Sequence, residues 1–101
     1  MKKIIAANLT VLFVFFNVYS AEYKGQNIDG IEYDCTAYSY STGKYYYVTV
    51  EFDGDEATIT FSNGGYITLT LDDEEIDDPH SISAYDYQRG VYWDLDVDGL
   101  D

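Results

Sequence analysis

The sequence predicts an all-β protein, a small antiparallel meander closed or nearly closed into a barrel. Apolar and polar residues alternate in several segments after residue 20, and the spacing of an amphipathic helix is missing there. Short turn-forming runs with glycine separate these segments, which is typical of antiparallel neighbours. A strand with this alternation has one apolar and one polar face, so such strands can enclose one core.

The predicted strands follow one another closely along the chain. They span residues 31–37, 45–52, 56–62, 66–72 and 91–97, and a further short strand is expected at 81–87. The inward-facing residues are expected to be Ile31, Tyr33, Cys35 and Ala37, then Tyr46, Val48, Val50 and Phe52, then Ala57, Ile59 and Phe61, then Ile67, Leu69 and Leu71, and finally Val91, Trp93, Leu95 and Val97. Closure of these strands into a barrel would also remove exposed sheet edges.

The links between the strands contain residues that tolerate a positive φ angle. Asp53-Gly54 and Asn63-Gly64-Gly65 fit tight hairpin turns, and residues 41–44 form a third turn. The acidic run at 72–79 interrupts the alternation, so we expect a solvated loop there. Residues 23–26 are expected to form a short loose start.

Residues 1–20 have the features of a secretory signal peptide. Lysines give a positive start, and the apolar stretch that follows, residues 4–16, is too short to span a bilayer well. Val18 and Ser20 fit the small-residue rule for cleavage, so we expect the cut after Ser20. The prediction is a single domain, residues 21–101, that is periplasmic or secreted and not attached to a membrane after cleavage.

The chain that remains after this cleavage is strongly acidic. Lys24, Lys44 and Arg89 are outnumbered by 19 Asp and Glu, which gives a formal charge of 3 − 19 = −16. Such a surface repels nucleic acid and anionic membranes, which excludes both as partners, and it attracts cations and basic proteins. A basic protein is therefore the expected partner.

The sequence contains no convincing catalytic or cofactor site, so we expect a protein that is not an enzyme and has no cofactor. The only histidine is His80, in an acidic loop, and the chain has neither a nucleophile elbow nor a Gly-rich phosphate loop. Asp94 to Gly99 match the first half of a calcium loop. The alternate carboxylates of an extended strand lie too far apart to share one ion, so no metal site is predicted.

Cys35 is the only cysteine, so the chain cannot form an internal disulfide. Two interpretations remain open. Cys35 is either a buried reduced thiol that packs as a small apolar side chain, or it forms a disulfide with another chain.

Tyrosine is the second compositional bias of the chain. Most tyrosines gather around the turn at 41–44 and near the end of the chain, namely Tyr38, Tyr40, Tyr45, Tyr46 and Tyr47, and then Tyr85, Tyr87 and Tyr92. Alternation places Tyr45 and Tyr47 on the face opposite to Tyr46, so part of the first group is exposed. Exposed tyrosines beside acids favour protein or glycan contacts, because they add rigid area with little loss of entropy.

Short motifs follow one another in an order that is found in a known family. They are Tyr33-Asp34-Cys35, Val48-Thr49-Val50-Glu51-Phe52, Asp53-Gly54-Asp55, Ala57-Thr58-Ile59-Thr60-Phe61, Ile67-Thr68-Leu69 and the run from Ser83 to Trp93. In this order the chain resembles the periplasmic and membrane-bound inhibitors of c-type lysozyme, the MliC/PliC family. The resemblance spans most of the chain after residue 20.

The resemblance implies a partner and a contact region. In that family a serine loop enters the lysozyme cleft. The serine corresponds to Ser83, with Tyr85, Asp86 and Tyr87 as the expected flanking contacts. The family's second cysteine has no counterpart here, and the position of its lysine falls near Val97, among acids.

The sequence therefore predicts an exported acidic binding protein, an inhibitor of a basic protein such as c-type lysozyme. Two alternatives stay open. One is an immunity-type or other partner-binding protein against a different basic toxin or enzyme. The other is a calcium-dependent or structural secreted β domain.

Overall fold

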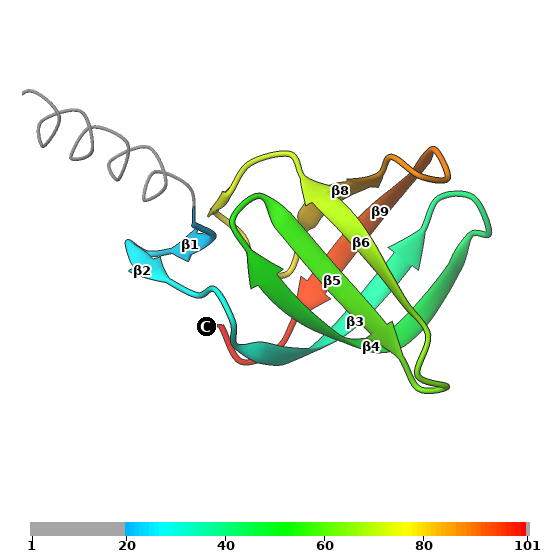
Figure 1. Ribbon diagram of the computed structural model, residues 1–101, viewed down its shortest axis with the longest axis horizontal. Coiled ribbons are helices and arrows are strands. Elements are labelled where there is room, and N and C mark those ends of the chain that lie inside the picture. The colour runs from blue at the N-terminus through cyan, green and yellow to red at the C-terminus, as the bar shows by residue number, and fades with distance from the viewer. Residues whose placement is uncertain (1–19, 101) are drawn as a thin grey trace, which may run out of the picture.

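The computed structural model describes residues 20–100 and confirms the predicted all-β fold. Six strands close into an antiparallel barrel in the order β3-β4-β5-β6-β8-β9, with β9 paired to β3 (Figure 1). The strands are β3 (Glu32–Ser39), β4 (Lys44–Asp53), β5 (Glu56–Phe61), β6 (Tyr66–Leu71), β8 (Ile82–Asp86) and β9 (Val91–Val97). The predicted signal peptide, up to residue 19, lies outside the described residues.

The predicted hairpin turns are present between the first four barrel strands. Gly54 (φ 62°) lies in the β4–β5 turn and Gly64 (φ 91°) lies in the β5–β6 turn. A residue with a side chain would be strained at these positive φ angles, so glycine is favoured at both. Residues 40–43 form the β3–β4 turn.

A second, three-stranded sheet corrects two expectations from the sequence. The expected loose start at residues 23–26 is instead a hairpin of β1 (Glu22–Tyr23) and β2 (Gln26–Asn27). Within the acidic run, β7 (Glu75–Ile76) pairs in parallel with β1, so this run is only partly a solvated loop. The physical reason is Ile76, which is buried and holds the acidic run against the core.

Asp29 joins this small sheet to the barrel. Its Oδ1 accepts a hydrogen bond from the backbone N–H of Ala21 at 2.9 Å and another from the N–H of Gly54 at 3.0 Å. The N–H of Ile28 also donates to the carbonyl oxygen of Ala21 at 2.9 Å. The first described residues are therefore held firmly against the β4–β5 turn.

The barrel encloses the core that the alternation predicts. Its largest fully buried apolar side chains are Phe52, Ile59, Leu69, Leu95, Val50 and Val97. One predicted member differs, because Ile31 precedes β3 and is 49% exposed. The other predicted inward residues are buried or pack against the buried cluster. The sequence thus assigns the inward face of each strand correctly. The residues between these inward positions form the outward faces.

Cys35 lies on the inward face of β3 and is 3% exposed. Burial is the main cause that raises the pKa of its thiol from 9.0 to about 12. The charges of Asp96 and Asp98 act in the same direction, against a backbone hydrogen bond at Asp96 that lowers the pKa. The thiol is therefore protonated and shielded from solvent, which favours the interpretation of Cys35 as a buried reduced thiol.

The folded protein is accordingly expected to resist thiol reagents. With its pKa near 12, Cys35 has a thiolate fraction roughly a thousandfold below that of the same thiol in the unfolded chain. Ellman's reagent should modify it very slowly in mildly alkaline buffer and rapidly in concentrated guanidinium chloride. Rapid labelling of the folded protein would contradict this burial. Absence of labelling in guanidinium chloride without reductant would favour a disulfide with another chain.

Candidate protein-binding face

Outward-facing side chains of β8, β9, β3 and β4 form a strip rich in tyrosine, here called the tyrosine face. Its members are Ser83, Tyr85, Tyr87, Tyr92, Asp94, Tyr38, Tyr40 and Tyr45. The strand pairing explains why they gather, since Tyr85 lies opposite Tyr92 and Asp94 lies between Ser83 and Tyr38. Tyr45 continues the row because it pairs with Tyr38.

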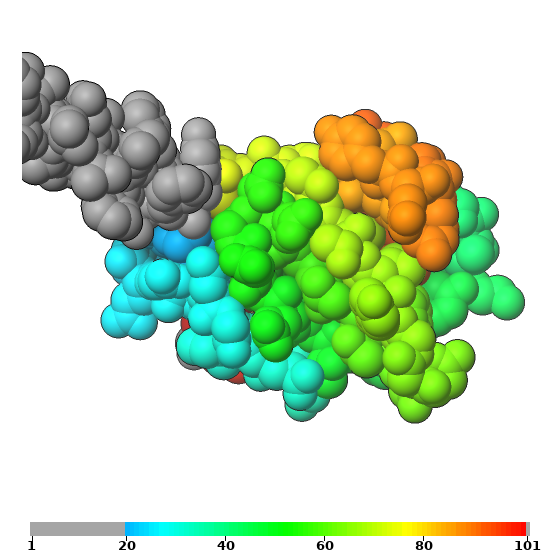
Figure 2. Space-filling view, viewed as in Figure 1, coloured from blue at the N-terminus to red at the C-terminus, as the bar shows by residue number. Residues whose placement is uncertain are grey.

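The tyrosine face reaches the end of the barrel where the β8–β9 and β3–β4 turns lie side by side (Figure 1). A backbone hydrogen bond of 3.1 Å from Tyr40 to the carbonyl oxygen of Tyr92 joins these two parts of the chain. Figure 2 shows the atoms of the β8–β9 turn, in orange, standing at the surface beside those of the β3–β4 turn. The small sheet of β1, β2 and β7 lies at the other end, so it does not cover this region.

The rings of β8 and β9 form an ordered aromatic cluster. Tyr85 lies between Tyr87 and Tyr92, with ring centroids 4.7 Å and 4.5 Å away. Tyr87 is 75% exposed and Tyr92 is 58% exposed. Because the rings contact one another, their orientations are restrained and a partner would meet a preformed apolar area.

Asp94 connects this cluster to the tyrosines of β3. Ser83 is exposed, and its hydroxyl donates to Oδ1 of Asp94 over 3.5 Å. The hydroxyl of Tyr40 donates to Oδ2 of Asp94 over 2.8 Å. This hydrogen bond, followed by the charge of Asp94, raises the pKa of Tyr40 above its usual value. Tyr40 therefore remains a neutral hydrogen-bond donor at physiological pH.

Asp86 is not at the surface, which corrects its expected role as a flanking contact of the partner. It is 1% exposed, on the inward side of β8. Its Oδ1 accepts hydrogen bonds from the backbone N–H groups of Gln88 at 2.9 Å and Arg89 at 3.2 Å. Its Oδ2 accepts one from Nη1 of Arg89 at 3.1 Å. Asp86 therefore positions the β8–β9 turn that carries Tyr87.

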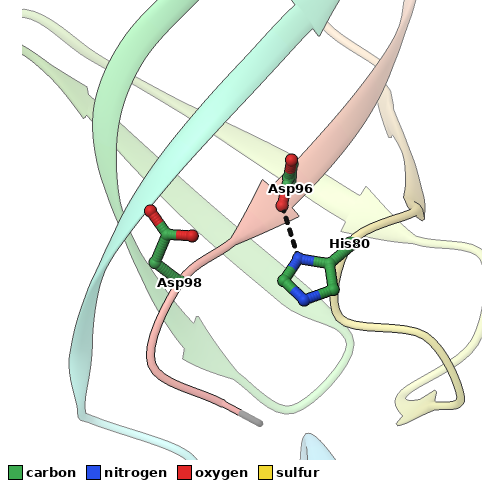
Figure 3. Close-up of side chains that lie close together, drawn as sticks. All are labelled: His80, Asp96 and Asp98. Carbon is green, nitrogen blue, oxygen red and sulfur yellow. Dashed lines mark hydrogen bonds and ion pairs between the residues drawn. The ribbon is translucent and has the colours of Figure 1, made fainter.

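A second group of chemically capable side chains, His80, Asp96 and Asp98, is drawn in Figure 3. Nδ1 of His80 lies 2.7 Å from Oδ1 of Asp96, and one candidate ligand atom from each residue lies within 4.8 Å of the others. Imidazole and carboxylate together can bind a divalent cation. All three side chains are exposed, however, and the ion pair of His80 with Asp96 accounts for the approach of those two residues. Asp94, which begins the half calcium loop, is engaged with Tyr40 instead.

The structure brings Ser83, Tyr85 and Tyr87 together as successive outward residues of β8 and its turn. It adds Tyr40 and Asp94, which lie 54 residues apart in the chain and which sequence reasoning did not join. The alternation marks both as outward-facing. Only the pairing of β3 with β9 makes them neighbours, and no local sequence signal specifies that pairing.

No family model, no curated protein and no solved structure matches the chain. Within residues 20–100, no helix has the length and hydropathy that crossing a membrane requires.

Proposed function

We propose that this protein is an exported acidic protein that binds and inhibits a basic protein such as c-type lysozyme. The observation that carries the proposal is the tyrosine face, where exposed rings and a carboxylate lie together on one side of the barrel. The chain that bears this face has a charge of 3 − 19 = −16 from Ala21 onward.

The exposed aromatic area supports a contact surface. Tyr45 is 70% exposed and Tyr87 is 75% exposed, although a tyrosine ring gains free energy when it leaves water. Tyrosine is also enriched among the residues that contribute most to binding at interfaces. Since the rings already contact their neighbours, little side-chain entropy remains to be lost on binding.

The charge supports a basic partner. A surface of one dominant sign speeds the encounter with a protein of opposite charge, and added salt screens this attraction. Association is therefore expected to be fast at low ionic strength and to slow as salt is added.

The resemblance of the Ser83 segment to the lysozyme inhibitors supports c-type lysozyme as that partner. Lysozymes are basic proteins, and their cleft contains two catalytic carboxyl groups. The exposed hydroxyl of Ser83 can donate to one of these carboxylates in place of Asp94. Tyr85 and Tyr87 would then pack against the walls of the cleft.

The chain from Ala21 onward, which contains the whole barrel, is expected to inhibit c-type lysozyme at low salt and less strongly at high salt. The measurement is the rate at which lysozyme clears a suspension of bacterial cell walls, at rising concentrations of the protein. Undiminished clearing in low salt, with the protein in large molar excess, would overturn the proposal.

Ser83→Ala should weaken this inhibition by about tenfold or more, because a hydrogen bond to a charged group contributes about 1.5–3 kcal/mol. Ser62→Ala is a matched control, since Ser62 is another exposed serine, located in the β5–β6 turn. It should inhibit like the unchanged protein. Equal inhibition by the two variants would remove Ser83 from the contact.

An immunity-type protein, directed against a different basic toxin or enzyme, is the second candidate. Asp94, Asp96 and Asp98 favour it, because they lie around the position where the lysozyme inhibitors have a lysine. Such a partner would be held by the tyrosine face without a requirement for Ser83. A pull-down at low and moderate salt, followed by mass spectrometry, would distinguish this partner from lysozyme.

A further inference from the structure

A hollow of about 410 Å³ opens on the tyrosine face among β3, β4, β9 and the segment before β8. Aromatic, acidic and imidazole side chains contribute to its lining, namely Tyr38, Tyr40, Tyr45, Asp94, Asp96 and His80. None of these residues belongs to the contact region expected around Ser83. The hollow is therefore a feature that the sequence does not predict.

Three tyrosines form the aromatic wall of the hollow. The half-buried ring of Tyr38 lies 5.2 Å from that of Tyr40, edge to face, and 4.9 Å from that of Tyr45. Tyr40 is 59% exposed and Tyr45 is 70% exposed. The wall thus offers ring surfaces to a ligand, and the central ring restrains the two outer ones.

Asp94 supplies the negative charge that is open to a ligand. The hydroxyl of Tyr40 donates to Oδ2 of Asp94 at 2.8 Å and so orients the carboxylate, and the hydroxyl of Ser83 lies 3.5 Å from Oδ1. Among residues 20–100 the ion pairs are His80–Asp96 and Arg89–Asp86, so Asp94 has no cationic partner in this part of the chain. A carboxylate that accepts two hydrogen bonds retains further acceptor sites.

We infer that this hollow binds a cationic side chain of the partner, and a guanidinium group in preference to an ammonium group. The inference rests on the proposed function and deepens it, because it names the side chain by which a basic partner is held. A guanidinium is planar, stacks on tyrosine rings and can donate two N–H groups to one carboxylate. An ammonium is a more strongly hydrated point charge, which gains less from an aromatic wall.

Asp94 is the carboxylate that meets this cation. Asp96 already pairs with His80 at 2.7 Å, and protonated His80 would oppose a second cation beside it. Asp94 lies two residues before Asp96 in β9, opposite Tyr38. A guanidinium at Asp94 would therefore lie against the aromatic wall while its charge is matched.

The test uses the chain from Ala21 onward with a hexa-arginine peptide as the probe, and a hexa-lysine peptide for comparison. Calorimetric titration at low salt should show hexa-arginine bound about threefold to tenfold more tightly than hexa-lysine. Asp94→Asn should weaken hexa-arginine binding by about tenfold, the effect of one charge-assisted hydrogen bond. Tyr45→Ala, which removes an exposed ring, should weaken it by about threefold.

Asp53→Asn is the matched control, because it removes the same charge from an exposed aspartate at the β4–β5 turn. It should change hexa-arginine affinity by less than about twofold, since a distant charge acts only through the screened field. Equal losses in the two asparagine variants would show that only total charge matters and would overturn the inference. Equal affinity for the two peptides would overturn the guanidinium preference. Thermal melts establish whether each variant is folded. If Asp94→Asn does not fold, Tyr45→Ala still tests the hollow.

The lysozyme assay separates this inference from the proposed function. If hexa-arginine binding depends on Asp94 while lysozyme keeps its full activity, the hollow is supported and the proposed partner is wrong. If lysozyme is inhibited but Asp94→Asn changes neither inhibition nor peptide binding, the proposed function is supported and the hollow is not the contact.

Discussion

Asp86→Ala is expected to lower the free energy of unfolding by about 2–3 kcal/mol, because a buried carboxylate that accepts several hydrogen bonds is removed. The backbone N–H groups of Gln88 and Arg89 would lose their acceptor, and the guanidinium of Arg89 would lose its ion pair. These groups hold the β8–β9 turn in place. The change should therefore also reduce any binding that depends on Tyr87, although Asp86 itself is 1% exposed.

Asp86→Asn is the informative control for this effect. It keeps an oxygen that can accept the two backbone hydrogen bonds and removes the charge that pairs with Arg89. We expect a loss of about 1 kcal/mol, clearly smaller than that of the alanine variant. Urea denaturation followed by Trp93 fluorescence measures both values. Equal stability of the alanine variant and the unchanged protein would show that the turn does not depend on Asp86.

Asp29→Ala is expected to cost a similar amount, about 2–3 kcal/mol, in a chain that begins at Ala21. Oδ1 of Asp29 accepts hydrogen bonds from the backbone N–H groups of Ala21 and Gly54, at 2.9 Å and 3.0 Å. The predicted cleavage after Ser20 would convert the nitrogen of Ala21 into an ammonium group. The hydrogen bond at Ala21 would then become an ion pair, whose charge-assisted hydrogen bond is shorter and stronger than one between neutral groups.

Asp29→Asn tests this ion pair, because it keeps an acceptor oxygen and removes the negative charge. The variant should lose about 1 kcal/mol more stability in a chain that begins at Ala21 than in one extended by a few preceding residues. Denaturation curves of the four proteins provide the comparison. Equal losses in the two backgrounds would contradict the ion pair, and N-terminal sequencing of the exported protein would check the cleavage point.

The barrel is predictable from the sequence because its information is local. Each strand from β3 to β6 carries its own alternation, and turns such as those at Gly54 and Gly64 force the next strand to pair with the previous one. The parity of β8 even places Asp86 on the same side as Ile82 and Ala84. The alternation within β8 therefore conflicts with a surface role for Asp86.

The remaining features depend on pairings between distant segments. Strand β7 has only two residues, which is too few for a periodic signal. Its parallel pairing with β1 depends on the burial of Ile76. The meeting of Tyr40 with Asp94 depends on barrel closure between β3 and β9. The alternation identifies Tyr40 and Asp94 as outward-facing, but it could not place them in one hollow.

The pairing of β9 with β3 also affects when the protein can act. Since β3 is the first barrel strand and β9 the last, Tyr40 and Asp94 come together only after nearly the whole chain is available. Contacts between such distant segments form late and slowly in folding. During the proposed export, a chain still threading through the membrane would therefore have no assembled face. Capture of the partner would begin only after the last strand has arrived outside.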